Sequence, residues 1–203
     1  MFWNELHKLD QGVSLEINSW ASPATDVIWQ FFSDIPAWIP MYVLIAAMLI
    51  WQLGWKKGLI TLLAVGLTFG FCDQFSNIVK DLVGRVRPLN DAFMLENGLN
   101  ILEKHSYSFS FFSAHAANAF GLATCTSVAL KNLLEETSDN EKKIRWHNIY
   151  AIWIFIWAPL VAISRVFVGK HYLGDVLVGS VIGVIAGYLF ATLASSICKK
   201  IRM

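Results

Sequence analysis

Charged residues are scarce in this chain of 203 residues. Asp, Glu, Lys and Arg make up 15% of it, against roughly 25% in typical soluble domains. Hydrophobic residues reach 56%, and several apolar runs reach the ~20 residues that cross a bilayer as a helix. This balance excludes an ordinary soluble domain and indicates an integral membrane protein. The net charge of +1 says little about partners, and we expect the bilayer and no nucleic acid.

Cysteine is also rare. The three cysteines, Cys72, Cys125 and Cys198, are scattered and match neither a disulfide framework nor a zinc pattern, so packing is their expected role. The chain has no acidic cluster suited to holding Mg²⁺, and we expect no metal and no cofactor. The start, MFWNELHKLD, lacks the apolar core of a cleavable signal peptide, so we expect a span to act as its own insertion signal.

Five apolar stretches predict clear transmembrane helices, at about 36–54, 58–79, 111–130, 148–165 and 174–197. Residues 1 to about 20 mix apolar and polar side chains and predict an amphipathic helix in the membrane interface. Residues 24–33 are apolar but short, which fits either a half-span or part of a tilted first span. We therefore expect an all-α polytopic membrane bundle of about six transmembrane helices, forming one domain over residues 1–203.

Alternation of these spans divides the basic residues between two faces. One face holds nine: Lys56, Lys57, Lys131, Lys142, Lys143, Arg145, Lys199, Lys200 and Arg202. The positive-inside rule makes this face cytoplasmic. The other face holds six: Lys80, Arg85, Arg87, Lys104, Arg165 and Lys170. Charged groups at membrane depth are costly and point to function, so we expect an outward-facing site in the inner membrane.

The stretch SRVFVGKHYLGD, residues 164–175, carries the densest chemistry. His171 and Asp175 are four residues apart, so on a helix they lie one turn apart on the same face. A carboxylate there accepts a hydrogen bond from one imidazole nitrogen and leaves the other as a nucleophile or base. Arg165 adds a fixed charge whose fork geometry suits phosphate oxygens. Taken alone, a basic juxtamembrane loop with an incidental histidine explains the stretch equally well.

Two further clusters fall at the same predicted face. In KDLVGRVRP, residues 80–88, Pro88 disfavours helix at Arg87, so the chain turns there; alone, this reads as a basic interfacial belt. Ser113-Ala114-His115 opens a span, where free backbone N–H groups and the helix dipole favour an anion. Alone, this reads as an N-cap serine before a packed histidine.

Taken together, the three clusters favour a functional interpretation over these simpler ones. They supply two histidines, an aspartate, three fixed cations, a hydroxyl and a helix N-terminus at span ends on one face. That set suits phosphoryl transfer, whose transition state spreads negative charge over oxygens and needs positioned cations. Because no magnesium site is evident, the cations would be side chains.

The order and spacing Lys80–x6–Arg87–Pro88, Ser113-Ala114-His115 and Ser164–Arg165–x5–His171–x3–Asp175 resemble the three-part signature of the type 2 phosphatidic acid phosphatases. These integral-membrane lipid phosphatases are related to vanadium haloperoxidases and bacterial acid phosphatases. The resemblance runs from about residue 36 to the last span. The middle motif usually reads Pro-Ser-Gly-His, whereas this chain has Phe112 and Ala114 in place of the proline and glycine.

The resemblance implies a metal-independent reaction in a bundle that usually has six spans, which favours residues about 13–33 as part of a sixth. It implies that His171 attacks phosphorus to form a phosphohistidine, that Asp175 orients His171, and that His115 exchanges protons with the leaving group and water. The phosphate oxygens would be held by Lys80, Arg87, Ser113, Ala114 through its N–H, and Arg165.

An outward-facing site excludes most cytosolic metabolites and predicts a membrane lipid phosphate as substrate. Undecaprenyl diphosphate is the first expectation, followed by lipid A and then by phosphatidylglycerol phosphate and phosphatidate. Two other classes of protein remain to compare. A transporter would show inverted repeats or matching broken helices, which the sequence lacks. A catalytically dead, phosphate-binding scaffold would lack catalytic side chains, and all of those expected are present.

Overall fold

In the computed structural model, the described residues (2–103, 107–134 and 141–200) form helices and connecting segments, without a strand. The α-helices are α1 (Phe2–Ser19), α2 (Pro23–Ser33), α3 (Ile39–Leu53), α4 (Trp55–Val83), α5 (Ala92–Glu96), α6 (Ala114–Leu134), α7 (Glu141–Phe167) and α8 (Leu173–Lys200), with 3₁₀ turns η1 (Pro36–Trp38) and η2 (Pro88–Asn90). The predicted all-α class is confirmed. Lys104 and Arg202, counted above among the basic residues of the two faces, lie outside the described residues.

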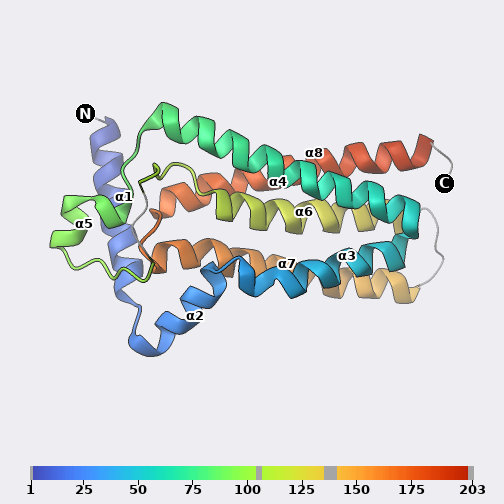
Figure 1. Cartoon of the computed structure of the whole chain (residues 1–203), viewed down its shortest axis with the longest axis horizontal. Helices are drawn as coiled ribbons and strands as arrows, with labels where there is room; N and C mark the ends of the chain where they lie inside the picture. Colours follow the sequence, from blue (N-terminus) through green and yellow to red (C-terminus); the bar gives the residue numbers. More distant parts are fainter. Residues whose placement is uncertain (1, 104–106, 135–140, 201–203) are drawn as a thin grey trace.

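Among the described residues, five helices of 15 residues or more, α3, α4, α6, α7 and α8, run along the long axis of the molecule, and α1 stands across one end of them (Figure 1). Among the described residues, four segments are long and apolar enough to cross a membrane: Pro36–Leu53, Trp55–Glu96, Arg145–Phe167 and Leu173–Lys200. The fifth long helix, α6, falls on the predicted span 111–130 but carries many small and polar residues. It is the helix that the others surround, so its surface meets protein more than lipid.

The packing of α6 on α8 forms the centre of the bundle. These two helices make the most extensive contact in the molecule, and glycines of α8 at four-residue spacing, Gly179, Gly183 and Gly187, lie against the α6 backbone. A Cβ on Gly183 would stand 2.1 Å from the Ala117 carbonyl oxygen. Small residues at this spacing allow close approach of membrane helices, where van der Waals packing and not water exclusion drives association.

The N-terminal region differs from the predicted sixth span. Residues 13–33 are divided between α1 and α2, because α1 ends at Ser19 and Ser22 caps a new helix through its side chain and Thr25. With 11 residues, α2 is about 16 Å long, too short to cross a hydrocarbon core of about 30 Å. The predicted helix over residues 1–20 is present as α1, and its placement in the membrane interface stays a prediction.

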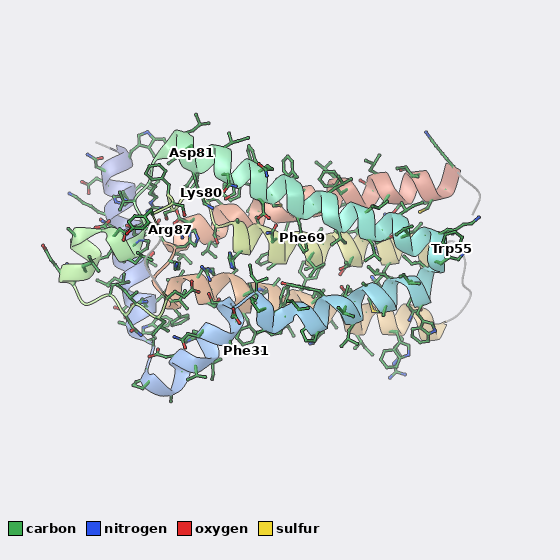
Figure 2. The ribbon with its side chains drawn as sticks, in the orientation of Figure 1. Phe31, Trp55, Phe69, Lys80, Asp81 and Arg87 are labelled. Atoms are coloured by element: carbon green, nitrogen blue, oxygen red, sulfur yellow. The ribbon has the colours of Figure 1, made fainter. Side chains whose placement is uncertain are left out.

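Helix ends determine where the predicted site residues lie. Gly84 takes a left-handed conformation, with φ of 63°, and its N–H bonds the Lys80 carbonyl, which ends α4. The chain then turns back toward the end of the bundle, and Arg87 is extended before Pro88, as the proline requires. Lys80 and Arg87 therefore lie at the α1 end of the molecule, whereas Trp55 marks the opposite end (Figure 2).

Candidate active site

The three predicted motifs meet at the α1 end of the bundle. Lys80 comes from the last turns of α4, Ala114 and His115 from the first turn of α6, and Arg165 from the last turn of α7. His171 lies in the short connection before α8, and Asp175 in the first turn of α8. Of these, Lys80, Arg87, Ala114, His115, Arg165 and His171 line one cavity of about 820 Å³.

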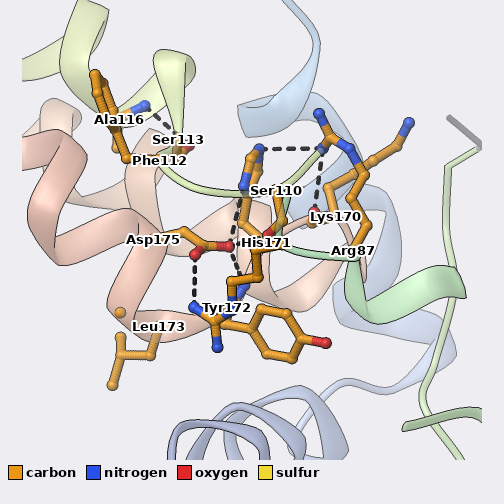
Figure 3. Close-up of polar contacts among 12 residues, drawn as sticks. Arg87, Ser110, Phe112, Ser113, Ala116, Lys170, His171, Tyr172, Leu173 and Asp175 are labelled. Atoms are coloured by element: carbon orange, nitrogen blue, oxygen red, sulfur yellow. Dashed lines mark hydrogen bonds and ion pairs between the residues drawn. The ribbon is translucent and has the colours of Figure 1, made fainter. Parts of the chain in front are cut away.

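His171 and Asp175 face each other, although His171 lies in the connection before α8 and not on the helix that the four-residue spacing assumed. Their Nδ1 and Oδ2 atoms are 3.4 Å apart, with the side chains 3% and 0% exposed. This separation is long for an N–H···O bond, and the buried Nδ1 has no hydrogen-bond partner among the described residues; resting catalytic contacts are often long in this way. On the other side of the ring, Nε2 lies 3.2 Å from Arg87 Nη1 (Figure 3). Arginine only donates, so Nε2 presents a lone pair and the ring proton sits at Nδ1.

The buried carboxylate of Asp175 is held from several sides. Its Oδ2 accepts hydrogen bonds from the Ser110 hydroxyl and from the Tyr172 N–H at 3.0 Å. Its Oδ1 accepts a bond from Arg85 Nη1 at 2.7 Å. A carboxylate with 0% exposure requires such partners, because an unpaired buried charge is strongly destabilising.

Arg87 is fixed by the chain around it. Its Nε and Nη2 donate to the carbonyl and hydroxyl oxygens of Ser108 at 2.8 and 2.9 Å, and Nη1 donates to the Lys170 carbonyl at 3.2 Å. These bonds aim the guanidinium at His171 before any substrate is bound. A preorganised cation costs no reorganisation during the reaction.

Arg165 is paired with protein groups in this structure. Its Nη1 donates to Glu103 Oε1 at 2.8 Å and to the Ser33 hydroxyl. Lys170 also lies 3.5 Å from Glu103 Oε2. Burial raises the pKa of Glu103, but Arg165, Ser33 and Lys170 together outweigh burial and hold it below its usual value. Glu103 therefore carries a negative charge against both cations at neutral pH.

Burial also sets the protonation state of His171. It lowers the pKa of the imidazole to about 4, because a cation is disfavoured in this environment, although Asp175 acts in the opposite direction. The ring is thus neutral at pH 7, and Nε2 carries the lone pair that a nucleophile needs. Attack on phosphorus requires Arg87 Nη1, which donates to Nε2 here, to transfer that hydrogen bond to the phosphate.

Ser113 and Ala114 form the start of α6. Ser113 is fully buried, its Oγ accepts the Ala116 N–H at 3.4 Å, and its own N–H donates to the Asp175 carbonyl at 3.1 Å. It caps the helix, as the simpler reading of this motif had it, and lies outside the residues that line the cavity. Ala114 and His115 do line the cavity. A phosphate role for Ser113 remains a prediction.

Several residues that hold this site were not identified from the sequence. Arg85, which was only counted among the basic residues of this face, bonds Asp175 and also Asp10 of α1, at 2.7 Å to each. Glu103, Ser110 and Ser108 carried no motif. The regular spacing of Asp10, Ser14 and Asn18 was a usable signal, since these residues share one face of a helix.

The residues present do not suggest a resident metal. Within the described part of the chain, no group of three or more His, Cys, Asp or Glu side chains is placed to hold a metal ion. Four positive side chains, Lys80, Arg87, Arg165 and Lys170, line the cavity with His171. The arrangement can therefore bind an anion next to a neutral imidazole.

The chain is similar to known proteins. Residues 57–197 match the PAP2 superfamily. The chain is 31% identical, over 97% of its length and 82% of the relative's, to a lipid A 4'-phosphatase of Bacteroides thetaiotaomicron. It is 33% identical, over 74% of its length and 64% of the relative's, to a phosphatidylglycerophosphatase B of Bacillus subtilis.

A solved structure shares the fold. The crystal structure of a transmembrane PAP2-type phosphatidylglycerolphosphate phosphatase from Bacillus subtilis superposes with a TM-score of 0.72, covering 96% of this chain and 88% of that one at 24% identity. With the apolar helices, the three clustered motifs and the family match over most of the chain, these findings give one conclusion: the chain belongs to the PAP2 superfamily and is a multi-pass membrane lipid phosphatase that hydrolyses phosphate monoesters.

Proposed function

We propose that this phosphatase acts on a lipid A-type glycolipid and removes a phosphate monoester from its sugar headgroup. The observation that carries the proposal is the similarity, along nearly the whole chain, to a lipid A 4'-phosphatase. Undecaprenyl diphosphate, the first expectation from the sequence, is not the named substrate of either relative described above, and it becomes a test compound. Phosphatidylglycerol phosphate is the second candidate, because the Bacillus relative is named for it.

The cavity suits a lipid that keeps its tails in the bilayer. From the phosphate-binding end it extends between α3, α4 and α7 to the aromatic residues Trp38, Tyr42, Phe69 and Trp157. Phe69 lies midway along α4, between Lys80 and Trp55 (Figure 2). An apolar continuation with a few polar groups at one end is typical of a ligand site, and here it would receive the acyl chains next to the phosphorylated sugar.

In the proposed reaction, Nε2 of neutral His171 attacks phosphorus and forms an N–P bond while the bond from phosphorus to the lipid oxygen breaks. His115 gives its proton to that oxygen, so the lipid leaves as an alcohol. His115 then takes a proton from water, whose oxygen attacks phosphorus. The N–P bond breaks, inorganic phosphate leaves, and His171 is neutral again. Asp175 stabilises the positive charge on the phosphorylated ring.

Side chains would supply the charge stabilisation in this scheme. Lys80 and Arg87 line the cavity beside His171, and Arg165 becomes available when the phosphate replaces Glu103 as its partner. The Ala114 N–H, at the positive end of α6, adds a backbone donor, with Ser113 behind it. No step requires a metal or another cofactor. We place the site on the outer face of the inner membrane, because the basic residues of short loops concentrate at the opposite end.

The test is phosphate release by purified protein in mixed micelles. The panel contains a lipid A 4'-phosphate, phosphatidylglycerol phosphate, phosphatidate and undecaprenyl diphosphate, each with a vanadate control. We expect vanadate-sensitive release from the lipid A substrate at least tenfold faster than from the others. Faster release from another lipid would reject the substrate assignment and leave the reaction class intact.

His171→Ala tests the nucleophile in the same assay. The imidazole forms the new bond to phosphorus in the first step, so we expect turnover to fall by at least three orders of magnitude, in line with the loss of a catalytic nucleophile. The variant should elute as a folded monodisperse species in detergent. Near-normal turnover would show that another group attacks phosphorus.

A further inference from the structure

A polar pair lies in the cavity below the phosphate-binding groups. Asn118 Nδ2 of α6 donates to Asp73 Oδ1 of α4 at 2.8 Å, and both residues line the cavity. Asp73 precedes Lys80 by seven residues, and Asn118 follows His115 by three. At 1.5 Å per residue, the pair is about one to two helical turns deeper in the bundle than these two residues. It belongs to none of the three family motifs.

The pair leaves hydrogen-bond acceptors without donors. Asn118 Oδ1 is buried and has no hydrogen-bond partner among the described residues, and the Asp73 side chain is exposed. Trp157, which lines the same cavity, has a buried Nε1 that is likewise without an acceptor in the described chain. Asp73 lies within an apolar segment able to cross the membrane, where an ionisable side chain is costly and is a sign of function.

The chemistry of these atoms indicates what they recognise. Two acceptors need ligand O–H or N–H donors, and an indole N–H needs an acceptor. A hydroxyl or an amide offers both. An acylated amino sugar carries hydroxyls and amide N–H groups next to its phosphate. Phosphatidate and undecaprenyl phosphates carry ester or phosphate acceptors and no such donors there.

We propose that Asp73 and Asn118 form a headgroup subsite that accepts hydrogen bonds from hydroxyl or amide groups next to the scissile phosphate. This inference rests on the proposed function, which it deepens, because it makes the donor-rich headgroup of an acylated amino-sugar phosphate the feature that the enzyme selects. An ester-linked phosphatidate satisfies neither acceptor and leaves them desolvated, which costs affinity.

The experiment compares kcat/KM of wild type and Asp73→Asn on a lipid A 4'-phosphate, phosphatidylglycerol phosphate and phosphatidate. The amide keeps a bond to Asn118, so α4–α6 packing is retained. We expect kcat/KM to fall about tenfold for the two lipids with donors, mainly through KM, and less than twofold for phosphatidate. Asp81 is an exposed carboxylate on the same helix beside Lys80 (Figure 2). Asp81→Asn is therefore the matched control and should leave kcat/KM unchanged for all three lipids.

Two outcomes for Asp73→Asn would overturn the subsite. Equal losses of kcat/KM on all three lipids would mean that Asp73 acts on Lys80, and no loss on any lipid would mean that Asp73 does not contact the headgroup. If wild type does not hydrolyse the lipid A substrate, the proposed function fails while the subsite is still tested by phosphatidylglycerol phosphate, whose glycerol hydroxyl is a donor, against phosphatidate. A wild-type preference for phosphatidate over both other lipids would reject the subsite.

A second inference comes from α1, whose polar face contacts the chain around His171. Asn18 Nδ2 donates to the carbonyls of Val166 and Phe167 at 3.1 and 2.9 Å. Ser14 Oγ and Asp10 Oδ1 accept the N–H groups of Leu173 and Gly174, at 2.8 and 2.9 Å. These bonds span both ends of the connection between α7 and α8, so α1 fixes the segment that carries His171.

Asp10 is connected to Asp175, the partner of His171, through Arg85. Arg85 bonds Asp10 Oδ2 and Asp175 Oδ1, each at 2.7 Å, and its side chain is 15% exposed. The guanidinium also lies 3.9 Å above the ring of Tyr172. This arrangement holds a planar cation in one orientation between two carboxylates, which arginine does better than lysine.

We infer that Asp10 and Arg85 are positioning residues, which orient Asp175 and through it His171 for attack. The inference uses the roles of His171 and Asp175 proposed above. Neither residue lines the cavity of the site, so neither should affect substrate binding. We expect kcat to fall about tenfold in Asp10→Asn and about a hundredfold in Arg85→Ala, with KM within twofold of wild type.

Chemical rescue separates positioning from a general structural effect. Guanidinium at millimolar concentration should raise the kcat of Arg85→Ala at least tenfold and leave the kcat of His171→Ala unchanged. Arg85→Lys should retain a higher kcat than Arg85→Ala. Glu5→Gln, an exposed carboxylate of α1 paired with Lys8, is the control for Asp10→Asn. A raised KM with unchanged kcat, an Asp10→Asn effect no larger than that of Glu5→Gln, or no rescue would overturn the inference.

Discussion

At the residue scale, the chemistry depends on keeping an imidazole neutral among cations. His171 is 3% exposed, and burial lowers its pKa to about 4 although Asp175 opposes this. A neutral ring can lie against Arg87 without charge repulsion and can offer Nε2 to phosphorus. Because the same histidine has a pKa near 6.5 in the unfolded chain, burial makes the free energy of unfolding depend on pH.

This difference predicts an acid-labile contribution to stability. Because the folded-state pKa lies below the unfolded-state value, the unfolded chain binds more protons between pH 6.5 and about 4, and stability falls as pH falls through that window. At pH 5 the loss is about 2 kcal/mol relative to pH 7. The melting temperature of His171→Gln should therefore fall by several degrees less than that of wild type between pH 7 and pH 5. The same pH dependence in both proteins would contradict this account.

The phosphate-binding charges predict the response to chelation. Lys80, Arg87 and Arg165 surround the cavity near His171, and they would supply the positive charge that a divalent ion provides in other phosphoryl-transfer sites. We expect EDTA to change kcat by less than twofold, whereas Arg165→Gln should lower kcat/KM at least tenfold. Strong inhibition by EDTA that added Mg²⁺ reverses would reveal a metal in the reaction.

Residues with a family motif could be found from the sequence, and those that support them could not. His115, His171 and Asp175 were located by fixed spacing and span ends. Arg85 and Glu103 act through contacts with segments far away in the chain, and nothing in their neighbours predicts such partners. The polar face of α1 was visible as periodicity, but the same pattern fits a helix whose polar side faces water.

At the element scale, the contact between α6 and α8 positions the reacting groups. His115 is the second residue of α6, and His171 lies two residues before the start of α8, so a shift between these helices changes the separation of the two histidines. The apolar pattern predicted both helices. It did not show that α6 is the central one, because a helix buried among others needs less hydrophobic surface than one facing lipid.

Gly183→Ala tests this contact. Its Cβ would stand 2.1 Å from the Ala117 carbonyl oxygen, which real structures do not tolerate, so the helices must separate. We expect a loss of about 1–3 kcal/mol, as for overpacked cores, with a drop of several degrees in the melting temperature and reduced turnover.

Gly70→Ala is the matched control. A Cβ at Gly70 of α4 would meet no atom within 4 Å, and alanine favours helix over glycine by up to about 1 kcal/mol. Its melting temperature should stay the same or rise. Equal effects of the two substitutions would show that close α6–α8 packing is not the reason for glycine at position 183.

At the scale of the whole molecule, all candidate catalytic groups lie at one end. The helices α1 and α5 lie there, and the C-terminal end of α8 lies at the other (Figure 1). Lys56 and Lys199 fall at that opposite end, at the start of α4 and the end of α8. The basic residues of short loops and tails are retained in the cytoplasm, so the chain should present its active site outward.

One added surface cysteine can reveal this orientation, because the three native cysteines are buried and should label slowly. Glu96→Cys places a thiol on an exposed position at the active-site end, and Lys56→Cys on one at the other end. In intact spheroplasts, a membrane-impermeant maleimide should label Glu96→Cys and leave Lys56→Cys unlabelled until the membrane is broken. The reverse pattern would place the site in the cytoplasm, where lipid phosphates of the inner leaflet would be its substrates.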